Sequence, residues 1–219
     1  MKLFDDIYLV AGAELDSDPG DANTYLIDGG QKLVLIDSGG GYNVEGLYRE
    51  MGKDGFDKSH IDMIINTHCH FDHTGGNYQI RKDTGCKTAI HETEVEAIEK
   101  DTELTVSDLW GHDLTPCPVD RELKGNEELA VGKHILKLVH VPGHSPGSTV
   151  ITMEQAGKKM VFIGDCLALL NLPGESKSDL RSSLQKLIEM EPDVLLTGHE
   201  GPIVTNPKEF LKEHLDIVL

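Results

Sequence analysis

Apolar residues near the N-terminus fall into three short runs separated by Gly, Asp and Pro. The runs are rich in β-branched and apolar residues, which predicts strands; they are IYLVAG (7–12), NTYLIDG (23–29) and KLVLIDSGG (32–40). The spacing then becomes helical, because Val44, Leu47, Tyr48 and Met51 share one helix face, and Gly52 is the expected end of that helix. The chain therefore opens with a meander of strands followed by an amphipathic helix.

The remaining chain alternates strand and helix patterns twice. The expected strands are IDMIINT (61–67), KTAI (87–90), HILKLVHV (134–141), STVITM (148–153), KMVFIG (159–164) and DVLLTG (193–198). The expected helices cover about 75–83 and 91–100, a segment from Ser178 with Leu180, Leu184, Leu187 and Ile188 in one stripe, and a last one from Asn206-Pro207 with Phe210, Leu211, Leu215 and Val218. Ser176 and Asp179 fit a capping box at the start of the third helix.

This order of elements predicts an α/β fold in which two sheets are sandwiched between helices. At 219 residues the chain is long enough for one large domain, and we expect a single domain over 1–219. The segment Asp101–Pro118 has no sustained period and contains Trp110, the only tryptophan. It is either a surface excursion with one anchored aromatic residue or a loop that covers the substrate.

Charge and composition narrow the possible partners. Lys and Arg total 20 against 38 Asp and Glu, a net charge of −18 that would repel a phosphate backbone, so we expect no nucleic-acid partner. No apolar run is long enough for a membrane span or a signal peptide, which predicts a cytoplasmic protein without a membrane partner. The four cysteines, at 69, 86, 117 and 166, form no C-x-x-C pair, so we expect reduced thiols.

The stretch HCHFDH places three histidines and one aspartate within six positions. Side chains two residues apart share a face of an extended chain, so His68 and His70 can converge on one ion while Cys69 points away. Asp72 and His73, further into the turn, project from a different face and could hold a second ion. Imidazole and carboxylate are the ligands that Zn²⁺ and Fe²⁺ prefer, so this stretch predicts a metal site.

Three further candidate ligands, His144, Asp165 and His199, stand where an apolar strand gives way to a Gly-containing turn. Such places commonly carry site residues in layered folds. Isolated histidines are more often surface or core residues than ligands, and we interpret six in that way: His60, His91, His112, His134, His140 and His214. The run Gly39–Gly41 is interpreted as a tight turn, since no phosphate-binding motif surrounds it.

The stretch HCHFDH, with the three later ligands in order, resembles the metallo-β-lactamase superfamily. LIDSGG, which contains Asp37, resembles the first aspartate motif of that superfamily, and the resemblance extends from about Tyr25 to Pro202. It implies a four-layer αββα sandwich with the site at one edge of the two sheets. It also implies the following roles: His68, His70 and His144 would bind one metal, Asp72, His73 and His199 a second, Asp165 would bridge them, and Asp37 would orient the ligands.

By this resemblance the protein is a dinuclear metallohydrolase with two divalent ions, Zn²⁺ in the first instance and Fe²⁺ or Mn²⁺ as alternatives. Two ions lower the pKa of a shared water from about 16 towards 7, which would supply a metal-bridging hydroxide at neutral pH. We expect Asp72 and Asp165 to be the catalytic carboxylates. Ser145 beside His144 is not an activated nucleophile, because adjacent side chains rarely face each other.

The branch of the superfamily sets the expected substrate. Class B lactamases do not place an aspartate where Asp165 stands, whereas glyoxalase II and the lactonases do. Glyoxalase II carries an additional helical domain, and this chain ends at Leu219 soon after His199. We therefore expect hydrolysis of a thioester, ester or lactone, with a small-molecule substrate.

Two other functions remain open at this point. A persulfide dioxygenase would use one iron held by residues matching His68, His144 and Asp165, and a facial set of two histidines and one carboxylate is the pattern of iron oxygenases. In that branch an Arg- and Gly-rich stretch follows the aspartate, whereas CLALLNLPG stands here. A non-catalytic or electron-transfer metal scaffold is the second alternative, although its diiron relatives typically have glutamate where His70 stands.

Overall fold

The computed structural model describes residues 1–12, 15 and 20–218. One sheet has seven strands in the order of the chain: β1 (Lys2–Phe4), β2 (Ile7–Ala11), β3 (Thr24–Asp28), β4 (Leu33–Ile36), β5 (Ile61–Ile65), β6 (Lys87–His91) and β7 (Arg121–Leu123). The other has five, in the order β12 (Val194–Thr197), β11 (Lys158–Gly164), β10 (Thr149–Gln155), β9 (His134–His140) and β8 (Glu127–Val131).

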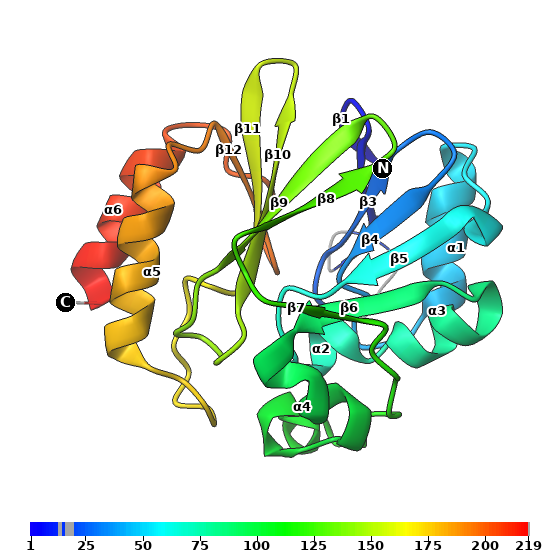
Figure 1. Ribbon diagram of the computed structural model, residues 1–219, viewed down its shortest axis with the longest axis horizontal. Helices are drawn as coiled ribbons and strands as arrows, with labels where there is room; N and C mark the ends of the chain where they lie inside the picture. The colour runs from blue at the N-terminus through cyan, green and yellow to red at the C-terminus, as the bar shows by residue number, and fades with distance from the viewer. Residues whose placement is uncertain (13–14, 16–19, 219) are drawn as a thin grey trace.

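Helices cover the outer face of each sheet, as Figure 1 shows. The α-helices are α1 (Val44–Lys53), α2 (Phe71–Thr74), α3 (Asn77–Thr84), α4 (Val95–Lys100), α5 (Lys177–Glu189) and α6 (Pro207–Val218). Helices α1 and α3 lie on the seven-stranded sheet, and α5 and α6 on the five-stranded one. The predicted αββα sandwich is therefore confirmed.

The alternation of side chains along β4 explains why these strands are apolar throughout. Val34 and Ile36 point into the core between the two sheets, whereas Leu33 and Leu35 point outward against the helices. Because both faces are covered, every residue of β4 is buried. The same holds for β12, where Leu196 faces the other sheet and Leu195 packs under α5 and α6.

Several predicted boundaries are wrong. Helix α1 continues through Gly52 and ends at Lys53. Gly55, with φ +84°, is the residue that takes the left-handed conformation beyond the helix. The helix expected at about 75–83 is α3, which begins two residues later, and the short helix α2 before it was not expected. The helix expected at 91–100 starts with the 3₁₀ turn η2 (Glu92–Glu94) and becomes α-helical at Val95.

The helix predicted from Ser178, which is α5, by contrast begins as expected. The Ser176 side chain accepts a hydrogen bond from the backbone N–H of Asp179, which confirms Ser176 as the N-cap. Leu180, Leu184 and Leu187 are buried against the five-stranded sheet. The last helix begins at Pro207 as predicted. The prediction for Val218 concerns its side chain, which lies outside the described part of the chain.

Three strands were not predicted, namely β1, β7 and β8. Their sequences, KLF, REL and EELAV, are short or rich in charged residues, so their apolar signal is weak. All three lie at sheet edges, where a charged face is tolerated because one side of the strand meets solvent. Only their pairing with β2, β6 and β9 makes them strands.

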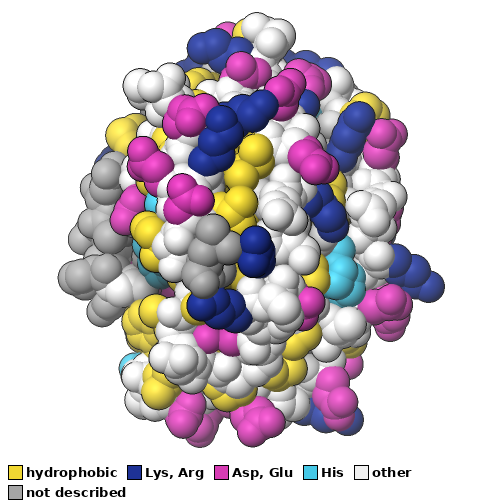
Figure 2. All heavy atoms as spheres, turned by 90° about the vertical axis from the view of Figure 1, so that its left-hand side faces the viewer, with side chains coloured by type: hydrophobic (Ala, Val, Ile, Leu, Met, Phe, Trp, Pro, Cys, Tyr) yellow, Lys and Arg dark blue, Asp and Glu magenta, His cyan; other side chains and the backbone are white. Residues whose placement is uncertain are grey.

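The carboxyl ends of β4, β5, β11 and β12 meet at one edge of the sandwich, beside α2 (Figure 1). The sheets are joined there by a hydrogen bond of 2.8 Å from the Thr149 N–H to the Thr67 carbonyl oxygen. Among the described residues, no helix is long and apolar enough to cross a membrane. Over α5 and α6, acidic and basic side chains of the described residues are interspersed (Figure 2).

Candidate metal centre

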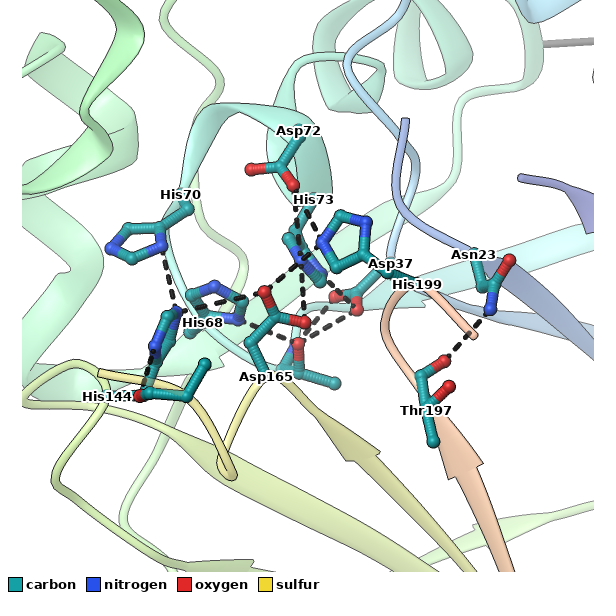
Figure 3. A network of polar contacts seen from close by, with 12 residues as sticks. Asn23, Asp37, His68, His70, Asp72, His73, His144, Asp165, Thr197 and His199 are labelled. Carbon is teal, nitrogen blue, oxygen red and sulfur yellow. Dashed lines mark hydrogen bonds and ion pairs between the residues drawn. The ribbon is translucent and has the colours of Figure 1, made fainter. Parts of the chain in front are cut away.

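The seven predicted ligands come together at this edge in two adjacent groups, drawn in Figure 3. The first group is His68, His70 and His144, and the second is Asp72, His73, Asp165 and His199. Within each group, one potential ligand atom per residue lies within 4.8 Å of all the others. His144, Asp165 and His199 thus lie beside residues 68–73, although they follow that stretch by more than seventy positions in the chain.

In the first group, His68 and His70 leave the end of β5 on the same side of the chain. Cys69 between them points away, into an apolar cluster with Phe71 and Ile90, as the alternation predicted. His144 comes from the loop between β9 and β10, and its Nε2 lies 3.0 Å from Nδ1 of His70. The side chains of all three histidines are buried.

In the second group, Asp72 and His73 stand on the short helix α2, not in an irregular turn as predicted. The helix turns both side chains toward the loops that follow β11 and β12. Nε2 of His199 lies 3.1 Å from Asp72 Oδ2 and 3.2 Å from Asp165 Oδ2. His73 is fully buried, whereas the His199 side chain is 38 % exposed and borders solvent.

Asp165 lies between the two groups (Figure 3). Its Oδ1 is 3.4 Å from Nε2 of His73, and its Oδ2 is 4.0 Å from Nε2 of His144. A single carboxylate therefore faces an imidazole of each group. That is the position from which a bridging ligand could reach two ions.

Asp37, which follows β4, organises two of the histidines. Its Oδ2 accepts hydrogen bonds from the Thr67 hydroxyl at 2.8 Å and from Nδ1 of His73 at 2.8 Å. Because the Thr67 hydroxyl donates its proton to Asp37, the hydroxyl oxygen of Thr67 accepts a hydrogen bond from Nδ1 of His68, 3.0 Å away. In both histidines Nδ1 is thus occupied by this bond, and Nε2 is the ring nitrogen that faces the site.

His144 is oriented in the same way by a backbone group. Its Nδ1 donates to the carbonyl oxygen of Ala168 at 3.0 Å, which leaves Nε2 free to face His70. Thr67 and Ala168 were not identified from the sequence. Thr67 is adjacent to His68 and ends the strand run, which is a usable signal, but the contact to Ala168 spans 24 residues and has no local signature.

The two groups differ in their affinity for protons. Burial lowers the pKa of His70 to about 3 and that of His68 well below its ordinary value, so both are neutral. Burial also disfavours charge on His73 and His199, but the facing carboxylates outweigh it. They raise the pKa of His199 to about 9 and that of His73 well above its ordinary value. The second group is therefore the more anionic environment.

The donor set fits divalent metal ions. Nε2 of His68 is buried without a hydrogen-bond partner, an expensive arrangement for a nitrogen lone pair unless a cation satisfies it. Imidazole nitrogens with two carboxylates are the ligands that Zn²⁺, Fe²⁺ and Mn²⁺ accept. The residues therefore fit a divalent metal ion.

Gly198 is a further site residue that the sequence did not reveal. A Cβ at this position would lie 1.9 Å from Oδ1 of Asp165 and 3.1 Å from Cε1 of His73. Only a residue without a side chain lets the ends of β11 and β12 come this close. The loop is also tied to the first sheet, because Asn23 Nδ2 and the Tyr25 hydroxyl both donate to the Thr197 carbonyl oxygen.

A pocket of about 680 Å³ opens above the two groups. His70, Asp72, His144, Asp165 and His199 line its floor. Segment 101–118 contains the 3₁₀ turns η3 (Glu103–Thr105) and η4 (Ser107–Trp110), and contributes a wall through Val106, Leu109 and Trp110. The segment therefore borders the pocket beside the candidate ligands, and its covering of a substrate stays a prediction.

Comparison with known proteins agrees with this geometry. The sequence profile of the metallo-beta-lactamase superfamily matches residues 17–199. The "probable metallo-hydrolase MJ0888" of Methanocaldococcus jannaschii is 35 % identical over 189 residues, which cover 81 % of this chain and 87 % of that protein. The human "acyl-coenzyme A thioesterase MBLAC2" is 31 % identical over 211 residues, covering 81 % and 72 % respectively.

Among solved structures, the subclass B3 metallo-beta-lactamase BJP-1 of Bradyrhizobium japonicum is similar over the whole chain. It has a TM-score of 0.83 and 26 % sequence identity, and the match covers 100 % of this chain and 89 % of that one. The fold and the histidine- and aspartate-rich centre thus define a metallo-hydrolase fold of the lactamase type. The chain belongs to the metallo-beta-lactamase superfamily.

Proposed function

We propose that the protein is a dinuclear metal-dependent hydrolase that acts on a thioester, ester or lactone. The observation that carries this proposal is Asp165, whose carboxylate faces His73 of one donor group and His144 of the other. The similarity to the probable metallo-hydrolase MJ0888 supports hydrolysis, and the similarity to the acyl-coenzyme A thioesterase MBLAC2 supports an acyl bond as its target.

Each residue of the centre has a distinct role in this proposal. His68, His70 and His144 would hold one ion, Asp72, His73 and His199 the other, and Asp165 both. Bound divalent ions would supply a water molecule of lowered pKa and stabilise negative charge on the carbonyl oxygen. Asp72 and Asp165, on the pocket floor, would orient the attacking water, while Asp37 holds two histidines in the required tautomer.

Metal analysis with ligand variants tests the proposal. We expect about two ions per chain in the purified protein, and a content nearer one in Asp72→Asn and His199→Gln, because both change the second donor group. The turnover of an ester or thioester should fall about a thousandfold in each variant, since the second ion then no longer helps to activate water. His60→Gln, an exposed histidine of the 3₁₀ turn η1 (Lys58–His60), is the matched control and should keep both properties.

The opposite result would identify the dioxygenase instead. A single iron per chain, consumption of O₂ with glutathione persulfide, and retention of that iron in Asp72→Asn would contradict the hydrolase. Failure to hydrolyse any ester, thioester or lactone after loading with Zn²⁺, Mn²⁺ or Fe²⁺ would contradict it as well. We expect no O₂ uptake, because the second group has the donors needed to hold an ion of its own.

A further inference from the structure

The pocket above the metal centre is polar at its floor and apolar on its walls. The wall residues come from two segments that lie on either side of the floor; they are Val106, Leu109, Trp110, Ala168, Leu170 and Leu172. Leu109 and Leu170 are 66 % and 61 % exposed. Both leucines face the same pocket and are open to solvent. Covering them with an apolar group removes apolar surface from water and is therefore favourable.

The first wall, formed by Val106, Leu109 and Trp110, is held in place by a half-buried network around Asp101. Asp101 Oδ1 accepts hydrogen bonds from the hydroxyls of Thr105, at 2.6 Å, and Ser107, at 2.9 Å. Its Oδ2 accepts one from the backbone N–H of Leu114 at 2.9 Å. One carboxylate thus pins both ends of the turn that presents Val106 and Leu109 to the pocket.

The second wall, formed by Ala168, Leu170 and Leu172, is also held by one carboxylate, that of Glu175. Glu175 accepts hydrogen bonds from the backbone N–H groups of Leu170, at 2.6 Å, and Leu172, at 3.1 Å. The two walls also meet, because a Cβ on Gly174 would lie 2.9 Å from Cδ2 of Leu104. These hydrogen bonds fix both walls, which reduces the entropy cost of binding a ligand between them.

The walls lack the chemistry that would bind an anion. Segments 101–118 and 165–176 contain none of the 20 Lys and Arg residues of the chain, whereas both contain acidic residues. A phosphate or carboxylate would find no cationic partner in these two segments. Their apolar side chains fit the uncharged part of a substrate.

We infer that this pocket binds the apolar acyl chain of the substrate, between the wall of Leu109 and the wall of Leu170, with the scissile carbonyl at the floor. This inference rests on the hydrolase function proposed above and narrows it to substrates with an alkyl acyl group. Each methylene that enters such a pocket should strengthen binding about two- to fourfold, until the walls are passed. Selectivity for the length of the acyl chain then resides in exposed leucines.

Binding of the product acids tests this directly, because Trp110 is the only tryptophan and lies in the wall. Zn²⁺-loaded protein is titrated with butanoate, hexanoate, octanoate and decanoate, and Kd is measured from Trp110 fluorescence. We expect Kd to fall with each methylene in the wild type. In Leu109→Ser and Leu170→Ser the decrease should be smaller, with octanoate bound about tenfold more weakly and butanoate changed less than twofold.

Val204→Ser is the matched control, since Val204 is 58 % exposed and does not line the pocket. It should keep the dependence on chain length. A Kd that is independent of chain length in the wild type, or a wild-type dependence in both leucine variants, would overturn the acyl-chain inference. Because this readout needs no turnover, it is separate from the test of the hydrolase: hydrolysis of a short ester by a protein without chain-length dependence would overturn the inference alone.

Discussion

Three histidines of the metal centre are aimed by hydrogen bonds on the ring nitrogen that faces away from it. His73 uses Asp37, His68 uses Thr67, and His144 uses the Ala168 carbonyl oxygen. Each bond occupies Nδ1 and leaves Nε2 directed at a neighbouring ligand. At the scale of single residues, the site is therefore specified as much by these partners as by the ligands.

Thr67→Val tests this arrangement. The substitution keeps the shape of the side chain but removes the oxygen that accepts from His68 Nδ1, so the tautomer of His68 is no longer set. We expect a 10- to 100-fold loss of Zn²⁺ affinity, measured by competition with a chromophoric chelator. Thr67→Ser retains the hydroxyl and should restore the affinity. An unchanged affinity in the valine variant would show that this hydroxyl has no role in orienting His68.

The charge state of His199 predicts how metal binding depends on pH. With a pKa of about 9 in the metal-free protein, His199 is protonated at pH 7.5 and must lose that proton before it can bind an ion. Metal binding should therefore release protons at pH 7.5, from His199 and from His73, whose pKa is also raised, and affinity should rise as the pH increases through about 9. Titration calorimetry in two buffers of different ionisation enthalpy measures the release.

The variant His199→Asn serves as the comparison for this experiment. It should release about one proton fewer than the wild type at pH 7.5, because the group that loses the proton is gone. His68 and His70 contribute little, since burial lowers the pKa of both and they are neutral at this pH. Equal proton release by the two proteins would contradict the assignment.

At the scale of elements, the centre depends on how closely the ends of two parallel strands approach. β11 delivers Asp165 and β12 delivers His199, and the backbone of Gly198 packs against the Asp165 carboxylate. The short helix α2 adds Asp72 and His73 from the other sheet. A change of a few tenths of an ångström between these elements would therefore be transmitted to several ligands at once.

Gly198→Ala tests this packing. The added methyl would displace the Asp165 carboxylate, whose Oδ1 it would approach to 1.9 Å, so we expect loss of metal and at least about a hundredfold loss of kcat/KM. Gly52→Ala is the matched control, because a Cβ there meets no atom within 4 Å and the position is inside α1. That change should raise the free energy of unfolding by about 0.5–1 kcal/mol. Wild-type metal content in Gly198→Ala would refute the role given to this glycine.

At the scale of the whole molecule, the fold and the metal centre have separate sources of stability. The core between the sheets, which includes Leu136, Ile151 and Phe162, consists of apolar side chains that bind no metal. The centre occupies the edge, where the strands have already ended. Metal binding should thus add to the stability of a structure that forms without it.

Chelation provides the measurement. Protein treated with EDTA should keep its far-UV circular dichroism and show a lower Tm, and Zn²⁺ should restore the Tm. Leu136→Ala should do the reverse: it should lower the free energy of unfolding by about 2–5 kcal/mol while metal content is unchanged, because Leu136 is fully buried away from the ligands. Loss of secondary structure on chelation would show instead that the metals are required for folding.

The sequence by itself determined the strands and helices with strong periodicity. The run LVLI of β4 is apolar throughout, and such a run predicts a strand that is buried on both faces. It also determined the seven candidate ligands, because their residue types and strand-end positions are local properties. The edge strand β8, where glutamates weaken the apolar pattern, could not be identified in this way.

The tertiary structure decided everything that depends on contacts between distant parts of the chain. Which ligands share a group, and that Asp165 lies between the groups, follows from the meeting of two sheets. The hydrogen bond from His144 to Ala168, the space that Gly198 leaves for Asp165, and the place of Trp110 in the pocket wall likewise join residues that are remote in sequence. Periodicity and residue type carry no information on such contacts, because they are set by packing between elements.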